Sequence, residues 1–96
     1  MATVYILYSK TIDTFYIGSC KELNLRIQQH LNKEFPNAYT SKANDWEVFF
    51  DKSNLESMLA RKIEVHIKKM KSRKYYESLK KYPEIFEKLI IKYSVK

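Results

Sequence analysis

The residues best placed to do chemistry in this chain surround its only glycine, Gly18. Gly18 ends the tripeptide Tyr16-Ile17-Gly18, and another tyrosine, Tyr5, lies in an apolar run eleven to fourteen residues earlier in the chain. Glycine inside a strand pattern marks a bulge or a place where a ligand or another backbone approaches closely. We therefore expect that a Cβ at Gly18 would clash with a neighbouring group, and that a functional site lies nearby.

Two other groups of side chains have spacings that suit a functional site. Arg26 and His30 are four residues apart, so they lie on the same side of a helix. Glu64 is the single acidic residue in the strongly basic part of the chain over 57–74. It could form an ion pair with Lys68 one helical turn later, or it could bind a metal ion. The sequence alone leaves both alternatives open.

The charge of the chain points to an acidic partner. The net charge is +7, and between Arg61 and Lys81 nine basic residues face two acidic ones. Nucleic acid is the commonest partner of such a surface, although a run of this kind is also found on ordinary solvated helices. Tyr75 and Tyr76 stand beside these basic residues and could stack on bases or pack in the core.

Length and composition exclude several classes of protein. Ninety-six residues with 45% apolar and 30% charged side chains are expected to form one modest core, and no apolar run approaches the length of a membrane span. The N-terminus lacks the pattern of a secretory signal. The single cysteine, Cys20, cannot form an internal disulfide, which fits a cytoplasmic location.

The first elements that must position these residues are two strands. Residues 3–8 and 15–20 have strand composition, and the link between them is short enough for an antiparallel hairpin. A turn centred between residues 11 and 12 places Tyr5 opposite Gly18. Strand alternation then puts Tyr5, Tyr16 and Gly18 on one face, which we expect to form the floor of a small polar cleft. The opposite, core-facing side carries Val4, Ile6, Phe15 and Ile17.

The remaining chain adds a third strand and several helices. Apolar spacing predicts a helix from Glu22 to about Asn32, a loop over 33–45 and a strand over 46–50. Residues 53–56 (Ser-Asn-Leu-Glu) fit a capping box for a helix that runs to about Lys71, followed by helices over 72–82 and 83–94. The buried stripe of the long helix is predicted to be Leu55, Leu59, Ile63, Ile67 and Met70.

This order of elements predicts an α+β fold with a small three-stranded antiparallel sheet flanked by helices. We expect residues 1–96 to form a single domain, with a core over about 3–79 and a C-terminal helix over about 83–94. The chain shows no internal repeat and no flexible linker.

Taken in order, these residues resemble the signatures of the GIY-YIG nuclease superfamily. The first signature is degenerate as Thr3-Val4-Tyr5, the second is intact as Tyr16-Ile17-Gly18, and Arg26 and His30 fit the family's first helix. The stretch around Glu64 resembles the one that supplies the family's metal ligand. The resemblance covers about residues 3–79 and is strongest to small stand-alone bacterial members and to the catalytic domain of excision-repair endonucleases.

The resemblance implies hydrolysis of a phosphodiester bond with one divalent cation, Mg²⁺ or Mn²⁺. Glu64 would be the metal ligand and Arg26 would hold a phosphate oxygen. Tyr5 would orient or deprotonate the attacking water with Tyr16 hydrogen-bonded close by, and His30 would orient the water or a phosphate. An asparagine that longer members carry about a dozen residues after the glutamate has no counterpart here.

The expected partner is DNA, with RNA not excluded, and no membrane is involved. A protein partner could supply specificity. The leading hypothesis is a structure-directed endonuclease in repair or recombination. One alternative is a non-catalytic nucleic-acid-binding module on the same fold, and another is a protein-interaction module that docks through Tyr75, Tyr76 and Tyr82. The residues expected to contact nucleic acid are Gly18, Lys68, Lys69, Lys71, Arg73 and Lys74.

Overall fold

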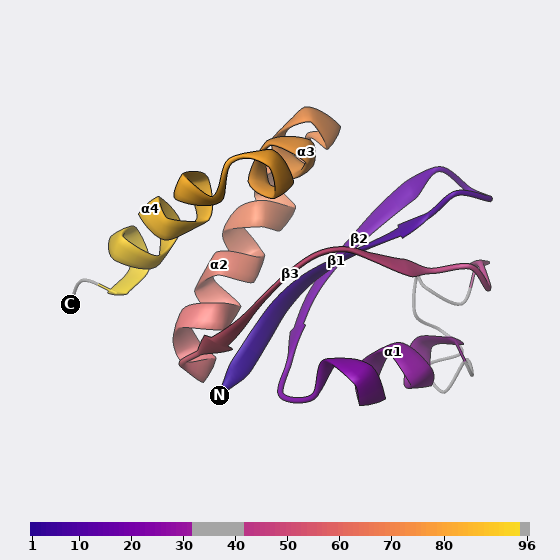
Figure 1. Ribbon diagram of the computed structural model, residues 1–96, viewed down its shortest axis with the longest axis horizontal. Helices are drawn as coiled ribbons and strands as arrows, with labels where there is room; N and C mark the ends of the chain where they lie inside the picture. The colour runs from indigo at the N-terminus through magenta and orange to yellow at the C-terminus, as the bar shows by residue number, and fades with distance from the viewer. Residues whose placement is uncertain (32–41, 95–96) are drawn as a thin grey trace.

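The computed structural model describes residues 1–31 and 42–94, and in them it contains a three-stranded antiparallel sheet and four helices. The predicted α+β class and the predicted sheet are therefore confirmed. The strands follow the order β2-β1-β3 across the sheet (Figure 1). The elements are β1 (Ala2–Ser9), β2 (Thr14–Cys20), α1 (Leu23–Leu31), β3 (Glu47–Leu55), α2 (Ser57–Met70), α3 (Arg73–Lys81) and α4 (Pro83–Ser94).

Helices cover both faces of the sheet, with α1 on one side and α2, α3 and α4 on the other (Figure 1). The main core lies under α2–α4 and includes Val4, Ile6, Ile63, Ile67 and Phe86. A second core lies on the α1 side of the sheet. Its buried members are Tyr5, Leu7, Cys20, Ala43 and Trp46, with Leu23, Ile27 and Leu31 of α1 packed against them.

The second core corrects the expectation of a polar cleft floor on the Tyr5 face. Tyr5 is only 1% exposed, and its ring lies beneath apolar side chains of α1 instead of facing open solvent. The hairpin register itself is as predicted, with Tyr5 opposite Gly18 and Leu7 opposite Tyr16. The sheet therefore buries both of its faces, and a site that includes Tyr5 has to reach solvent at an edge of the sheet.

The start of α2 differs from the predicted capping box. Ser53 and Asn54 remain in β3, which continues past Phe50 through an irregularity in its pairing with β1, and Leu55 pairs with Ala2. Asn54 adopts a left-handed conformation (φ +62°), which asparagine tolerates better than most residues. The helix is capped by Glu56, whose carboxylate accepts hydrogen bonds from the amides of the second and third helical residues, each at 3.1 Å.

The C-terminal half of the chain otherwise follows the sequence pattern. Ser72 caps α3, where its hydroxyl accepts a 3.2 Å hydrogen bond from the Tyr75 amide, and α4 begins at Pro83. Met70, predicted to be buried, is 42% exposed because α2 ends beside it at Lys71, a residue in the left-handed conformation. None of the described helices is long and apolar enough to cross a membrane.

Asp45 anchors the turn of the β1–β2 hairpin. One carboxylate oxygen accepts a 2.6 Å hydrogen bond from the hydroxyl of Ser9, and the other accepts bonds from the amide and hydroxyl of Thr11 at 3.0 and 2.8 Å. These donors favour the charged carboxylate, with the Ser9 hydroxyl contributing most, and they lower the pKa of Asp45 to about 2.

The low pKa of Asp45 predicts acid-dependent stability. Because the folded state holds this proton less tightly than the unfolded state, whose pKa is near 3.8, Asp45 stabilises the fold above that value. The contribution is lost as the pH falls through about 4 to about 2. We expect Asp45→Asn to be less stable than the wild type at pH 7, with the difference closing towards pH 2. Urea midpoints measured across this pH range test the expectation, and parallel profiles of the two proteins would contradict it.

Candidate active site

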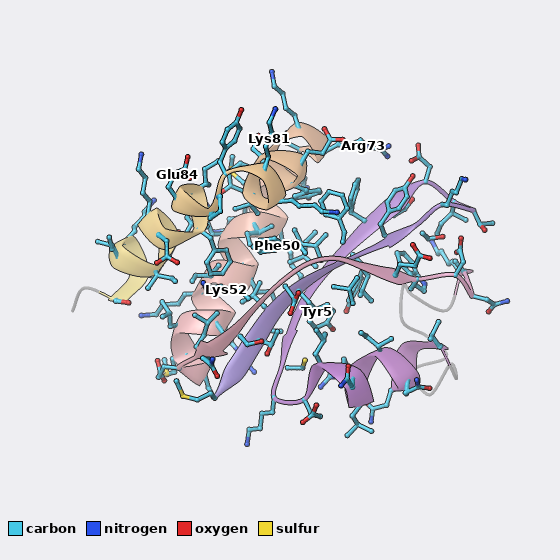
Figure 2. All side chains as sticks on the ribbon, viewed as in Figure 1. Tyr5, Phe50, Lys52, Arg73, Lys81 and Glu84 are labelled. Atoms are coloured by element: carbon cyan, nitrogen blue, oxygen red, sulfur yellow. The ribbon has the colours of Figure 1, made fainter. Side chains whose placement is uncertain are left out.

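Gly18 lies directly under the ring of Tyr5. A Cβ built on Gly18 would stand 2.5 Å from the Tyr5 hydroxyl oxygen and 2.7 Å from Cζ, well inside van der Waals contact. The expected steric conflict at Gly18 is therefore confirmed, but the group that a Cβ would meet is the Tyr5 side chain and not another backbone segment. Figure 2 shows Tyr5 on the α1 side of the sheet. With no side chain on Gly18, the phenol can lie across β2, which is an edge strand of the sheet.

Tyr16 and several charged groups lie near the Tyr5 hydroxyl. The two tyrosine rings have centroids 6.5 Å apart, and Tyr16 packs edge-on against Trp46. Burial raises the pKa of Tyr5 far above its usual value, and Tyr16, Cys20 and Glu64 raise it further, while the positive charge of Arg26 lowers it. Tyr5 therefore carries its proton at neutral pH. Arg26 and Glu64 both lie within electrostatic reach of its hydroxyl.

Glu64 reaches the same edge from the opposite face of the sheet. Helix α2 packs across β1 and β2, and strand alternation turns Ser19 towards this helix. The Ser19 hydroxyl donates a hydrogen bond to Oε1 of Glu64, and the ammonium of Lys68 donates to Oε2 at 2.5 Å. The ion pair with Lys68, one of the two alternatives for Glu64, is thus present. Together, the ion pair and the hydrogen bond from Ser19 fix the Glu64 carboxylate next to the Gly18–Ser19 segment, with the Glu64 side chain 17% exposed.

The donor set around Glu64 fits a weakly held hard cation. Residues 1–31 and 42–94 contain no group of three or more histidine, cysteine, aspartate or glutamate side chains that could enclose a metal. Magnesium needs no such enclosure, since it is commonly bound by one or two carboxylates together with water and substrate phosphates. Glu64 can serve as the one protein ligand of such an ion, and Lys68 would have to give up Oε2 or share the carboxylate.

A hollow of about 430 Å³ opens beside Ser19, the residue that donates a hydrogen bond to Glu64. Its walls come from the end of β2, from α1 and from the first half of α2. Three cationic side chains, Lys21, Arg26 and Arg61, line it together with one acidic side chain, Glu22. The excess of positive charge suits a phosphate group. Burial raises the pKa of the Cys20 thiol, which also lines the hollow, and disfavours its thiolate form.

The structure brings together five of the residues singled out from the sequence: Tyr5, Tyr16, Gly18, Arg26 and Glu64. They come from β1, β2, α1 and α2 and lie around β2: Tyr5 covers Gly18, Glu64 is held by Ser19 on the opposite face, and Arg26 lines the hollow at the end of the strand. His30 lies in α1 one turn after Arg26, but its side chain is outside the described part of the structure.

The basic residues predicted to contact nucleic acid have different neighbours in the structure. Lys68 is paired with Glu64, Lys69 lines a different hollow against α4, and Lys71 forms the C-cap of α2. Lys74 is exposed on α3. A binding role for these residues stays a prediction, but the left-handed turn at Lys71 separates the group that the sequence presents as continuous.

Arg73 has a structural role that the sequence did not indicate. Its guanidinium donates to the carboxylate of Asp13 at 2.7 Å and to the Asp13 carbonyl at 2.8 Å. The hydroxyl of Tyr8 donates to the same carboxylate at 2.5 Å. Arg73, labelled in Figure 2 at the start of α3, thereby ties this helix to the tip of the β1–β2 hairpin.

Three residues around the site carried no predicted role. Ser19 follows the Tyr16-Ile17-Gly18 signature and holds Glu64, which strand alternation could have suggested once α2 was known to cover that face. Arg61 precedes Glu64 by three residues and therefore lies on a neighbouring part of the helix surface. Lys21 follows the end of β2. Nothing in the sequence placed Lys21 opposite Arg61 before the positions of α1 and α2 were known.

Comparison with known proteins identifies a family for the chain. Residues 1–94 match the model of the GIY-YIG catalytic domain. No curated protein and no solved structure matches the chain.

Proposed function

The chain belongs to the GIY-YIG family, a family of nuclease domains, and we propose that it is a divalent-metal-dependent endonuclease that hydrolyses phosphodiester bonds in DNA. The observation that carries the proposal is the electropositive hollow at the end of β2, which Arg26 lines together with Ser19. Ser19 holds Glu64 by a hydrogen bond, and Tyr5 lies over the neighbouring Gly18. The three side chains come from three separate elements, and each has a chemical type that phosphodiester hydrolysis needs.

The roles of these residues follow from their surroundings. Arg26 lines the hollow and would bind a nonbridging phosphate oxygen, offsetting charge that develops in the transition state. The protonated hydroxyl of Tyr5 would orient the attacking water, with Tyr16 beside it. To remove a proton from the water, Tyr5 would have to be a phenolate, and that form would need a nearby positive charge such as that of Arg26. An Mg²⁺ or Mn²⁺ ion held by Glu64 would supply Lewis-acid stabilisation of the phosphate. His30 is proposed to orient the water or a phosphate.

We propose that the substrate is chosen by shape, as expected of an enzyme of repair or recombination. Contacts from lysine and arginine to phosphates position a nucleic acid without reading its sequence. Flaps, branches and single strands are therefore the proposed substrates. We further propose one domain, with a catalytic core over 3–79. Phe86 and Leu89 of α4 support this, because they pack into the main core with α2.

The second candidate is a module of the same fold that binds nucleic acid without cutting it. The contact between Lys68 and Oε2 of Glu64 favours it, since a permanent ion pair would keep a cation away from the carboxylate. The missing asparagine after Glu64 also favours it.

Lys68 is predicted to compete with the metal for Glu64. Its side chain is 47% exposed, and ion pairs of this kind are worth no more than about 1 kcal/mol. Replacing it in Lys68→Met should therefore tighten Mn²⁺ binding by roughly two- to fivefold. Mn²⁺-induced broadening of the Ser19 amide signal in NMR spectra measures the affinity without nucleic acid. Lys74→Met, which also removes one charge, is the control. Equal Mn²⁺ affinities in the two variants would contradict the competition.

The test of the proposed function is a panel of DNAs that share one sequence and differ in shape. End-labelled duplex, flapped, branched and single-stranded forms are incubated with excess protein in Mg²⁺, in Mn²⁺ and in EDTA. We expect cutting of at least one shape, and only with a divalent metal. Binding to DNA without cutting under any condition would favour the second candidate. If the protein does not bind DNA but binds another protein with an affinity that is insensitive to salt, a protein-interaction module is favoured instead.

A further inference from the structure

Two hollows flank α2, and they share one residue, Arg61. The first, of about 430 Å³, is the hollow beside the candidate active site, where Arg61 stands with Lys21 and Arg26. The second, of about 290 Å³, lies between α2 and α4 and is lined by Arg61, Lys62 and Lys69 among others. Arg61 therefore links the active-site hollow to a cationic surface on the outer side of α2.

The two hollows are strongly electropositive. Glu22 is the one acidic side chain in the lining of the first, and the lining of the second contains no acidic side chain among the described residues. The second also contains His66, whose Nδ1 is 2.7 Å from the hydroxyl of Tyr93. Burial, and after it the charges of Lys92 and Lys69, lower the pKa of His66. His66 therefore lies within reach of the positive charge of Lys69, which lines the same hollow.

Arg61 is available to an outside ligand. Lys52, Lys68 and Arg73 are each paired with a carboxylate, those of Glu87, Glu64 and Asp13. Arg61, in contrast, is exposed, and its side chain forms no ion pair or hydrogen bond within residues 1–31 and 42–94. A guanidinium in this position can bind a phosphate through two parallel hydrogen bonds.

We propose that Arg61 binds a backbone phosphate of the nucleic acid other than the one that is cut, and that the strand continues from there over Lys62 and Lys69. The proposal rests on the proposed function, because it takes Arg26 to hold the scissile phosphate. A small free anion would occupy one hollow at a time. A nucleic-acid strand carries a phosphate at every nucleotide and can use both hollows at once, which is why we assign the ligand to this class.

This path differs from the one predicted from the sequence. The basic run beyond Lys69 continues through Lys71 and Lys74, but α2 ends at Lys71 and the first residue of α3, Arg73, is bonded to the hairpin tip. The path through Arg61 instead follows the exposed face of α2 between the two hollows. It would place the strand along α2, from the first hollow, which Ser57 also lines, towards Lys69 in the last turn.

The test measures binding without cutting. Fluorescence polarisation of a labelled single-stranded oligonucleotide is followed in EDTA at several salt concentrations, with wild type, Arg61→Ala, Arg61→Lys and Lys88→Ala. Lys88 is an exposed residue of α4 outside both hollows, so Lys88→Ala controls for the loss of one charge. We expect Arg61→Ala to weaken binding about five- to tenfold at low salt and to reduce the slope of log affinity against log salt by about 1. Arg61→Lys should restore the slope.

The outcomes for the inference and for the proposed function can be told apart. If Arg61→Ala and Lys88→Ala bind alike, or if no oligonucleotide binds, the inference is overturned even where DNA is cut. If Arg61→Ala alone loses affinity but the wild type cuts nothing, the subsite stands and the nuclease proposal fails. Where cutting occurs, Arg61→Ala should raise KM and leave kcat nearly unchanged, because a phosphate remote from the reaction is bound equally in ground and transition states.

Discussion

Glu64→Gln is expected to lower the rate of metal-dependent cleavage about a thousandfold. Glutamine keeps the shape of the side chain and an oxygen that can accept from Ser19, but it removes the negative charge that would attract a divalent cation. A metal that stabilises the transition state by several kcal/mol is thereby lost, and about 4 kcal/mol corresponds to roughly a thousandfold in rate. Single-turnover rates on the best-cut DNA of the panel measure the effect.

The matched control for this variant is Glu77→Gln, which removes the same charge from an exposed position on α3. It should cut at nearly the rate of the wild type. Thermal unfolding should show both variants folded, because Glu64→Gln weakens one hydrogen bond, from Ser19, and removes one partly exposed ion pair, with Lys68. A Glu64→Gln protein that cuts within tenfold of the wild-type rate would place the metal elsewhere.

Gly18→Ala is expected to damage both stability and activity. The new Cβ would stand 2.5 Å from the Tyr5 hydroxyl oxygen and 2.7 Å from Cζ, so either the tyrosine or β2 must shift. Overpacking of a buried site typically costs about 1–3 kcal/mol. A displacement of Tyr5 by about 1 Å would also lower the cleavage rate on the order of a hundredfold. Urea denaturation and single-turnover cleavage measure the two effects.

A double-mutant cycle identifies the cause of the Gly18→Ala effect. In a Tyr5→Leu background the shorter side chain leaves the hydroxyl and Cζ positions empty, so Gly18→Ala should cost clearly less stability there than in the wild type. Equal costs in the two backgrounds would show that contact with Tyr5 is not what requires glycine at this position.

The hairpin and its register could be predicted from the sequence because they depend on local information. Strand alternation and a short polar link determine that Tyr5 stands opposite Gly18, and the structure has this pairing. The prediction of a polar cleft floor was wrong, and the reason lies elsewhere in the chain. Whether a tyrosine face is open or buried depends on where α1 packs, and α1 covers Tyr5 with its own apolar residues.

The start of α2 shows how a correct local motif can lose to tertiary pairing. Residues 53–56 match a capping box, but pairing of Leu55 with Ala2 keeps this segment in the sheet. Glu56, the last residue of the motif, then becomes the cap itself. The pairing partner is more than fifty residues away in the sequence, so no window around Ser53 contains the deciding information.

The charged residues were the hardest to assign from the sequence. The run from Arg61 to Lys81 appears uniform, yet α2 and α3 direct its members to different neighbours: Lys68 pairs with Glu64 on α2, and Arg73 pairs with Asp13 in the hairpin. The role of a basic side chain depends on the nearest carboxylate, which the fold alone determines. A cytoplasmic location, inferred from composition, stays a prediction.

The most direct test of the proposed function uses a closed circle of single-stranded DNA that carries a short hairpin. This one molecule offers a single strand, a duplex and the branch where they join, and it has no ends. The protein is added in excess in Mg²⁺ and, separately, in EDTA, and the circles are resolved from linear products on a denaturing gel. We predict linear DNA in Mg²⁺ and intact circles in EDTA. Circles that stay closed in Mg²⁺, or that open equally in EDTA, would contradict a metal-dependent endonuclease.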